Sequence, residues 1–174
     1  GREDFAAYFA REARLHWTIA AGHAGREHAD DVLQDAAMIA LSKLGSFRVG
    51  TNLRAWFAQI VTHVARNTRR KRAKATPVPF AEAAAAELPG ALPIDRRGHL
   101  HADQDAFDDD VVAALGELAS EARAALLLRV VHELPYAEIA TTLGMPEGTV
   151  MSHVHRARAL LRSRLAPVGK EIPR

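Results

Sequence analysis

The stretch that most limits how this chain can fold, residues 134–165, has the pattern of two helices joined by a tight turn. Gly144 is placed to end the first helix, and Pro146 suits the first turn of the second, where its missing N–H is no loss. Apolar residues then recur at intervals of four, three and four, at Val150, Val154, Ala157 and Leu161. This spacing favours a helix-turn-helix, in which the second helix enters the major groove of DNA.

The other face of that second helix is polar and basic, and no Asp or Glu occurs between residues 148 and 170. Its first turn is placed to reach base edges, and its later basic residues are placed to hold phosphates. An ordinary helical hairpin with a solvated basic face is the alternative. On the helix-turn-helix interpretation, the residues predicted to contact DNA are Glu147, Thr149, Ser152, His153, His155, Arg156 and Arg158.

The N-terminal part of the chain is predicted to form a small helical bundle. Residues 5–74 have helical patterning, with breaks at residues 22–25 and 45–51. In both 33–44 and 53–64, apolar side chains follow the offsets of a single helix face. Such stripes pack face to face, and this packing needs no cofactor.

Residues 75–109 differ in composition from both flanking parts. They contain four prolines and a run of alanines, and no helical stripe continues through them, so they predict a flexible linker. Beyond the linker, residues 110–132 are expected to form two short helices, the second capped by Ser120, that support the helix-turn-helix. The predicted fold is all-α, with two small helical domains at residues 1–74 and 110–168, this linker between them and a tail at 169–174.

A strongly basic run ends the first predicted domain. Six of the nine residues from Arg66 to Lys74 are positively charged, and none is acidic. Against phosphate, such a cluster releases counterions and gives salt-dependent affinity without sequence preference. The alternative is a solvated helix end, where cations also favour the negative end of the helix dipole. Because a second basic element lies beyond the linker, we favour binding to nucleic acid.

Composition and the absence of certain motifs argue against several other classes of function. The 174-residue chain has no cysteine, which excludes disulfides, thiol catalysis and cysteine zinc sites and suits a reducing cytoplasm. No apolar run is long enough to span a bilayer, so no membrane insertion is expected. His153 and His155 point to different sides of a helix, so no metal or other cofactor is predicted there. No phosphate-binding loop, nucleophile motif or carboxylate pair is evident, and an enzyme is not predicted.

Three stretches, in this order and spacing, are similar to those of one known family. Residues 29–35, ADDVLQD, resemble an acidic helix that docks on RNA polymerase. Residues 47–56, FRVGTNLRAW, resemble the loop and helix that open and read a promoter −10 element. Residues 148–152, GTVMS, with residues 155–158, HRAR, resemble the helix that reads a −35 element. The chain thereby resembles the extracytoplasmic-function (ECF) sigma factors, dissociable specificity subunits of bacterial RNA polymerase.

The resemblance implies that the chain directs core polymerase to a two-element promoter and traps unstacked −10 bases, without chemistry of its own. The implied partners are core RNA polymerase, through its clamp and flap elements, promoter DNA and an anti-sigma factor, all in the cytoplasm. The implied −10 contacts are Phe47, Thr51, Asn52, Arg54, His63, Arg66, Asn67, Arg69, Arg70 and Arg72. The implied polymerase contacts are Asp30, Asp31, Val32, Leu33, Gln34, Asp35 and Ile39.

Two other functions fit part of the sequence. A response-regulator-like transcription factor would share the helix-turn-helix but lack the acidic docking helix. An RNA-binding adaptor would use the basic run but leave the helix-turn-helix unexplained. The sequence also departs from the family at His63, where many members have Asn, and at His153, where an arginine is common. Trp56 lies within an apolar stripe, so we expect it in the core rather than stacked on a base.

Overall fold

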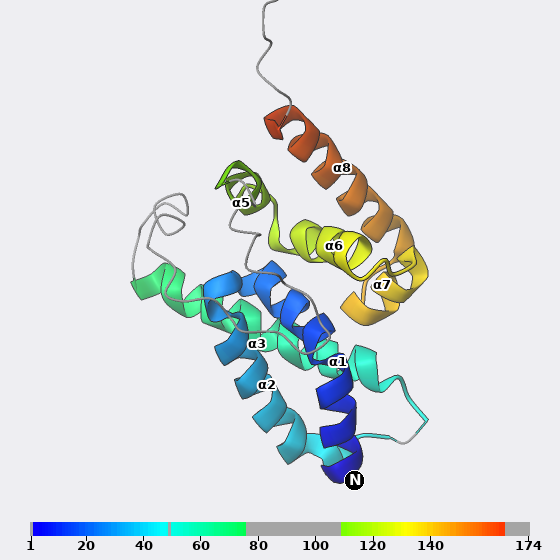
Figure 1. Cartoon of the computed structure of the whole chain (residues 1–174). Helices are drawn as coiled ribbons and strands as arrows, with labels where there is room; N and C mark the ends of the chain where they lie inside the picture. The colour runs from blue at the N-terminus through cyan, green and yellow to red at the C-terminus, as the bar shows by residue number, and fades with distance from the viewer. Residues whose placement is uncertain (1, 49, 76–108, 166–174) are drawn as a thin grey trace, which may run out of the picture.

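A computed structural model of the chain describes residues 2–48, 50–75 and 109–165. Within these ranges every regular element is a helix, and none combines the length and hydropathy of a membrane span. The predicted linker and tail lie outside the described residues, except that Ala75 ends one helix and Asp109 begins another. The elements are α1 (Arg2–Ala24), η1 (Arg26–His28), α2 (Ala29–Lys43), η2 (Leu44–Ser46), α3 (Leu53–Ala75), α5 (Asp109–Gly116), α6 (Ser120–Val131), α7 (Tyr136–Leu143) and α8 (Glu147–Leu165) (Figure 1).

The first three long helices, α1, α2 and α3, pack on one another. Phe57 of α3 is fully buried, and its ring meets the rings of Phe5 and His16 edge-on, at centroid distances of 5.3 and 4.5 Å. Ile19 of α1 and Val32 of α2 are at most 1% exposed and belong to the same buried cluster. Burying a large apolar side chain contributes about 1.5–3 kcal/mol, so this cluster holds the three helices together as the predicted stripes require.

The last four helices form a second group around α6. This helix packs on α7 and α8, and α5 lies on α8. Leu128, Ile139 and Val154 are at most 1% exposed and form the centre of the group. Ser120 is not the N-cap that the sequence predicts, because α6 begins at Ser120 itself and Ala119 precedes it.

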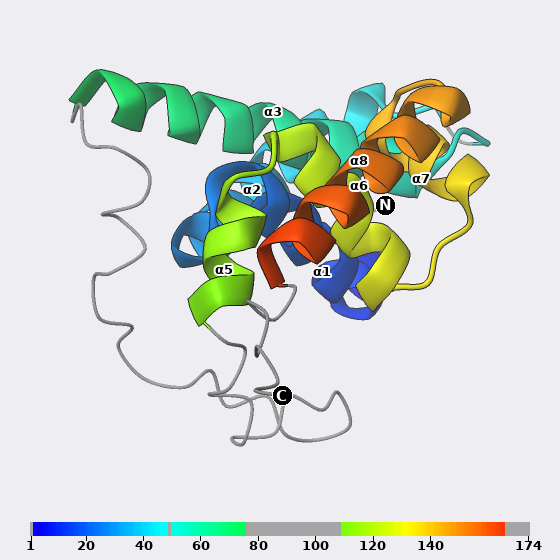
Figure 2. The same ribbon diagram turned by 90° about the horizontal axis from the view of Figure 1, so that it is seen from above.

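The two groups pack directly against each other, with α6 along α1 and α7 on α3 (Figures 1 and 2). They meet closely at Gly22 of α1, where a Cβ atom would lie 2.8 Å from the Cα and Cβ atoms of Ala124, so a side chain would not fit. Arg123 Nε donates to the carbonyl oxygen of Gly22 at 2.8 Å, and Thr18 Oγ1 lies 2.8 Å from His132 Nε2. The buried residues of both groups form one continuous core. The sequence predicts two helical domains joined by a linker and gives no sign of this contact between them.

Candidate nucleic-acid interface

The turn between α7 and α8 has the predicted helix-turn-helix geometry. Gly144 adopts the left-handed conformation, with φ 66° and ψ 41°, which glycine reaches without strain. The N–H of Met145 donates to the carbonyl oxygen of Ala140 at 3.0 Å. Val150 and Val154 are at most 1% exposed on the inner side of α8. Their burial fixes which face of α8 points outward.

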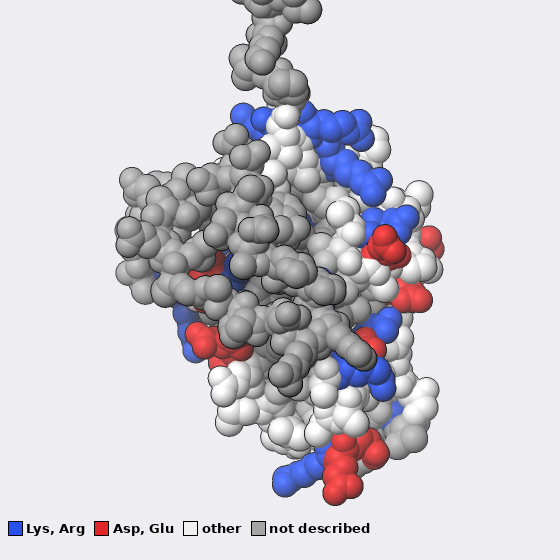
Figure 3. Space-filling model, in the orientation of Figure 1, with Lys and Arg blue, Asp and Glu red and all other residues white. Residues whose placement is uncertain are grey.

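The outward face of α8 carries the residues predicted to read the −35 element. In Figure 3, basic side chains follow the upper right of the molecule, where Figure 1 places α8. Of the predicted set, His153 is half-buried, and the exposed members are Glu147, Thr149, Ser152, His155, Arg156 and Arg158. A face that is already exposed in this way can meet a DNA groove without rearrangement of α8.

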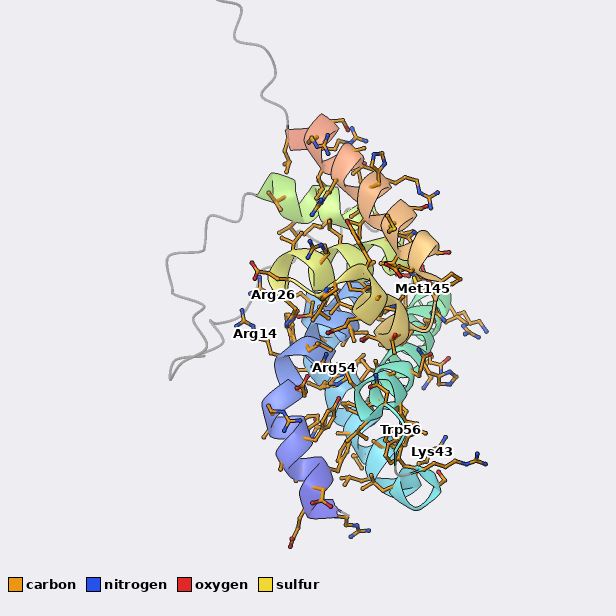
Figure 4. All side chains as sticks on the ribbon, turned by 90° about the vertical axis from the view of Figure 1, so that its right-hand side faces the viewer. Arg14, Arg26, Lys43, Arg54, Trp56 and Met145 are labelled. Atoms are coloured by element: carbon orange, nitrogen blue, oxygen red, sulfur yellow. The ribbon has the colours of Figure 1, made fainter. Side chains whose placement is uncertain are left out.

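The loop before α3 is held by its own side chains. Asn52 Oδ1 accepts a hydrogen bond from the N–H of Ala55 at 3.0 Å and thereby caps α3. Thr51 Oγ1 donates to a main-chain carbonyl three residues back, at 2.8 Å. The ring of Phe47 lies 5.0 Å from that of Trp56. Trp56 packs against the core but stays half-buried, so it is less enclosed than the sequence predicts (Figure 4).

The predicted basic residues follow the outer side of α3, whose last turns project past the other helices (Figure 2). The side-chain amide of Asn67 is hydrogen-bonded to His63 at 3.0 Å, and Arg72 lies 3.5 Å from Glu27 of η1. Asn67 is half-buried, and the exposed members of the predicted set are His63, Arg66, Arg69, Arg70 and Arg72.

Two of the predicted arginines are paired with acids of the second helical group. Arg54, labelled at the junction of the two groups in Figure 4, has its Nη1 3.1 Å from Oε2 of Glu138 in α7. Its Nη2 lies 3.0 Å from Glu12 of α1. Arg66 Nη2 donates to Oε1 of Glu121 in α6 at 3.0 Å. Sequence reasoning missed these acids, because the partners lie 84 and 55 residues apart and no local spacing signals them.

The carboxylate of Glu121 is held in its charged form. Burial by itself raises the pKa of Glu121, but hydrogen bonds from its own backbone N–H, from Ser120 and from Arg66 outweigh burial and lower the pKa to about 2. Glu121 is therefore ionised at neutral pH, and its pair with Arg66 persists over the physiological range.

A cleft of about 490 Å³ opens beside the other pair. It lies between α1, the start of α3 and α7, and its lining includes Glu12, Asn52, Arg54 and Glu138. Water and ions therefore reach the Arg54 guanidinium from this side.

Three histidines lie beside the contact between the two helical groups. Burial lowers the pKa of His16 and that of His23 to about 4, and it also lowers the pKa of His132. The hydroxyl of Tyr8 lies 2.6 Å from His16 Nε2. These imidazoles are neutral at pH 7. The described residues hold no group of three or more His, Cys, Asp or Glu that could bind a metal.

The solvent side of α2 combines a row of acids with apolar side chains. Trp17 Nε1 donates to Oδ1 of Asp30 at 2.9 Å, which orients that carboxylate. Of the residues predicted to dock on polymerase, Ile39 is half-buried, and the exposed ones are Asp30, Asp31, Gln34 and Asp35.

Two predicted docking residues need correction. Val32 and Leu33 are only 1% and 8% exposed, because they belong to the apolar stripe that faces α1 and α3. The apolar area beside the acids comes instead from Met38 and Leu41, which are 66% and 39% exposed. The signal for Met38 is its spacing from Asp31 and Asp35, which places all three on one face of the helix.

A helix-turn-helix and a second basic helix, together with a separate acidic face, are the features of a helical DNA-binding protein. Residues 8–75 match Sigma-70 region 2 and residues 108–161 match Sigma-70 region 4, which we call region 2 and region 4 below. The chain belongs to the ECF sigma factors, RNA polymerase subunits that direct the core enzyme to promoters and initiate transcription.

Individual relatives agree with this assignment. The chain is 32% identical over 145 residues to the ECF RNA polymerase sigma factor EcfG of Rhodopseudomonas palustris, covering 83% of this chain and 75% of that protein. It is 30% identical over 142 residues to the ECF RNA polymerase sigma-E factor of Escherichia coli, covering 79% and 74%. Its fold is similar to that of the sigma factor RpoE from Bartonella quintana, solved in complex with the anti-sigma factor NepR, with a TM-score of 0.67 at 25% identity over 96% of this chain and 99% of that one.

Proposed function

We propose that three surfaces of this chain divide the work of promoter recognition. The outer face of α8 reads the −35 element, the loop before α3 and the outer side of α3 hold the −10 element, and the outer face of α2 docks on core polymerase. The observation that carries the proposal is that most residues predicted for each task gather on the exposed side of one element, and that these elements follow the order of the family's regions.

At the −10 element, the chain must recover the cost of opening the duplex. Unstacking costs a few kcal/mol per base, which is returned when the extruded base is stacked and hydrogen-bonded by protein. Thr51 and Asn52 are exposed in the loop, beside the aromatic pair of Phe47 and Trp56. The basic row of α3 supplies phosphate contacts that do not depend on sequence.

At the −35 element, the first turn of α8 carries the groups that can discriminate bases. Glu147 can accept from a cytosine amino group, and Thr149 and Ser152 can contact bases or phosphates. Arg156 and Arg158 act as phosphate contacts that set the position of the helix in the groove.

At the polymerase, the α2 face joins charge to apolar area. Its acids, Asp30, Asp31 and Asp35, guide encounter and register with a basic partner surface. Met38 and Leu41 supply the apolar centre that a protein interface needs.

The chain itself makes and breaks no bond, needs no cofactor, and works in the cytoplasm where polymerase and chromosome lie. The polymerase clamp and flap elements and promoter DNA are its partners. The match to a sigma factor solved with an anti-sigma factor supports an anti-sigma partner for this chain as well.

Binding to purified core polymerase tests the docking surface. Asp31→Arg places a cation opposite the basic partner surface and should weaken binding at least about ten-fold, because like charges in an interface cost several kcal/mol. Glu3→Arg, an equal charge reversal at the exposed start of α1, is the control and should bind as the original chain does. Equal binding by both variants would remove α2 from the proposal.

A further inference from the structure

Two arginines that we assign to promoter DNA are already bound to carboxylates of region 4. Arg54 pairs with Glu138 at 3.1 Å, and Arg66 pairs with Glu121 at 3.0 Å. A carboxylate offers a guanidinium the same kind of paired acceptor oxygens as a phosphate does. The positions that the two acids occupy are therefore closed to a DNA backbone while the pairs persist.

The pairs sit on a packed contact between the two regions. Arg123 of α6, only 8% exposed, donates to the carbonyl oxygen of Gly22 in α1, where the two helices meet too closely for a side chain. On the other side, the side chain of Gln59 in α3 lies against Gly144 of the helix-turn-helix. The packing of α6 on α1 and of α7 on α3 thus places Glu121 and Glu138 next to the arginines of region 2.

Each pair is also open to competition. The side chains of Arg54 and Arg66 are 32% and 47% exposed, and those of Glu138 and Glu121 are 52% and 32% exposed. Ion pairs this accessible to water are individually weak. A polyanion that reaches them can replace the carboxylates, provided that region 4 moves away.

We propose that the contact between regions 2 and 4 is an autoinhibitory clasp, in which Glu121 and Glu138 take the place of DNA phosphates on Arg66 and Arg54. The proposal rests on the proposed function for the role of the two arginines. In the closed chain, with α6 on α1 and α7 on α3, these two arginines of the −10 surface are occupied, and separation of α6 from α1 and of α7 from α3 releases them from the region 4 acids. The outer face of α8 is exposed in the closed chain, so the clasp acts on the −10 face alone.

Two different variants should open the clasp. Glu121→Gln combined with Glu138→Gln removes both charges and keeps the shape of each side chain. Gly22→Val changes no charge and forces α1 from α6, because its Cβ would lie 2.8 Å from Ala124.

A matched control changes the same number of charges elsewhere in region 4. Glu117→Gln combined with Glu133→Gln also removes two carboxylates. Glu117 pairs with Arg164 of α8 at 2.7 Å, and Glu133 is exposed, so neither change touches the clasp. The control also releases one arginine and therefore measures what a freed cation does by itself.

Opening is measured in the free full-length chain by fluorescence energy transfer. Because the chain has no cysteine, Lys43→Cys in region 2 and Val130→Cys in region 4, both at exposed positions, give two unique labelling sites. A fluorescent single-stranded oligothymidine is the binding probe, and circular dichroism verifies that each variant keeps its helices. Both opening variants should lower energy transfer and bind the oligonucleotide about 3- to 10-fold more tightly, and the control should do neither.

The proposal is overturned if energy transfer and oligonucleotide affinity stay unchanged in both opening variants, or if the control gains as much affinity as they do. Transcription by core polymerase with the unaltered chain separates the two claims. If the unaltered chain transcribes normally but energy transfer shows that neither opening variant separates the regions, the clasp is refuted and the proposed function stands. If the opening variants do separate the regions but the unaltered chain supports no transcription, the proposed function is refuted instead.

Discussion

The two basic faces of this chain are treated differently by the rest of the molecule. On α8, Arg156 makes a hydrogen bond to the carbonyl oxygen of Ser152 in its own helix and is otherwise directed to solvent. On α3, Arg66 is held by an acid of region 4, and Arg54 is held by an acid of region 4 together with Glu12 of α1. The comparison teaches that the basic face of α8 is open as it stands, whereas two arginines of α3 are already paired with region 4 and, under the proposed clasp, are released only when the regions part.

The difference fits what each face has to bind. A recognition helix reads intact duplex and needs no change in the DNA. A basic helix that tracks single strands binds any nucleic acid through its phosphates. Under the proposed clasp, pairing two arginines of α3 with acids of region 4 therefore limits unspecific binding, and the face of α8 that reads duplex DNA needs no such control.

The largest effect is expected from Phe57→Ala. Removing this fully buried ring from between α1 and α3 should lower the free energy of unfolding by about 3–5 kcal/mol. Because one core spans both regions, urea unfolding followed by circular dichroism should remain a single transition that shifts as a whole. Leu41→Ala, at a site 39% exposed, is the control and should shift it little. A second, unshifted transition would show that the two regions unfold independently, which would contradict the single core on which the comparison of the two faces depends.

The next largest effect is expected from acid. His16 and His23 have pKa values lowered to about 4 by burial, so the folded chain binds their protons less readily than the unfolded chain does. Their contribution to stability is present above about pH 6.5 and is lost as the pH falls toward 4, by about 2 kcal/mol per histidine between pH 7 and pH 5. Urea midpoints at the two pH values measure it. His16→Gln should reduce this pH dependence, and His63→Gln, at an exposed site, should preserve it. Equal midpoints at pH 7 and pH 5 in the unaltered chain would contradict the prediction.

The smallest effect compares the two faces directly. In the free chain, Arg156→Ala should weaken binding to duplex DNA a few-fold and reduce the salt slope by about one, as loss of a single phosphate contact does. Arg54→Ala should not weaken that binding, because Arg54 is already occupied by Glu12 and Glu138. Anisotropy titrations at several salt concentrations measure both. An equal loss in the two variants would mean that Arg54 is free to bind DNA in the free chain, against the comparison of the two faces.

What the sequence predicted well is local. The end of α7 at Gly144 and the inner stripe of α8 follow from spacing within a few residues, and the structure confirms both. The apolar stripe of α3 likewise predicted the burial of Phe57 and Val61. A helix period needs no knowledge of its partner, and this is why these elements could be predicted.

What the sequence did not predict depends on distant partners. Glu121 and Glu138 look like ordinary exposed acids until α6 and α7 are placed on region 2. The sequence suggests a helix break at Gly22, yet α1 continues through it to Ala24. The glycine is needed instead for the close approach of Ala124, which leaves no room for a side chain. Val32 was expected on a docking surface because residues 29–35 resemble a helix that docks on polymerase, although its side of the helix faces the core.

The most direct test of the account is run-off transcription with purified core polymerase on genomic DNA fragments. The unaltered chain should give discrete start sites preceded by two elements. Asp31→Arg should abolish these transcripts through loss of polymerase binding, and Arg156→Ala should remove their dependence on the upstream element. If the unaltered chain gives no specific transcript, or if both variants transcribe as it does, the assignment of these surfaces is contradicted.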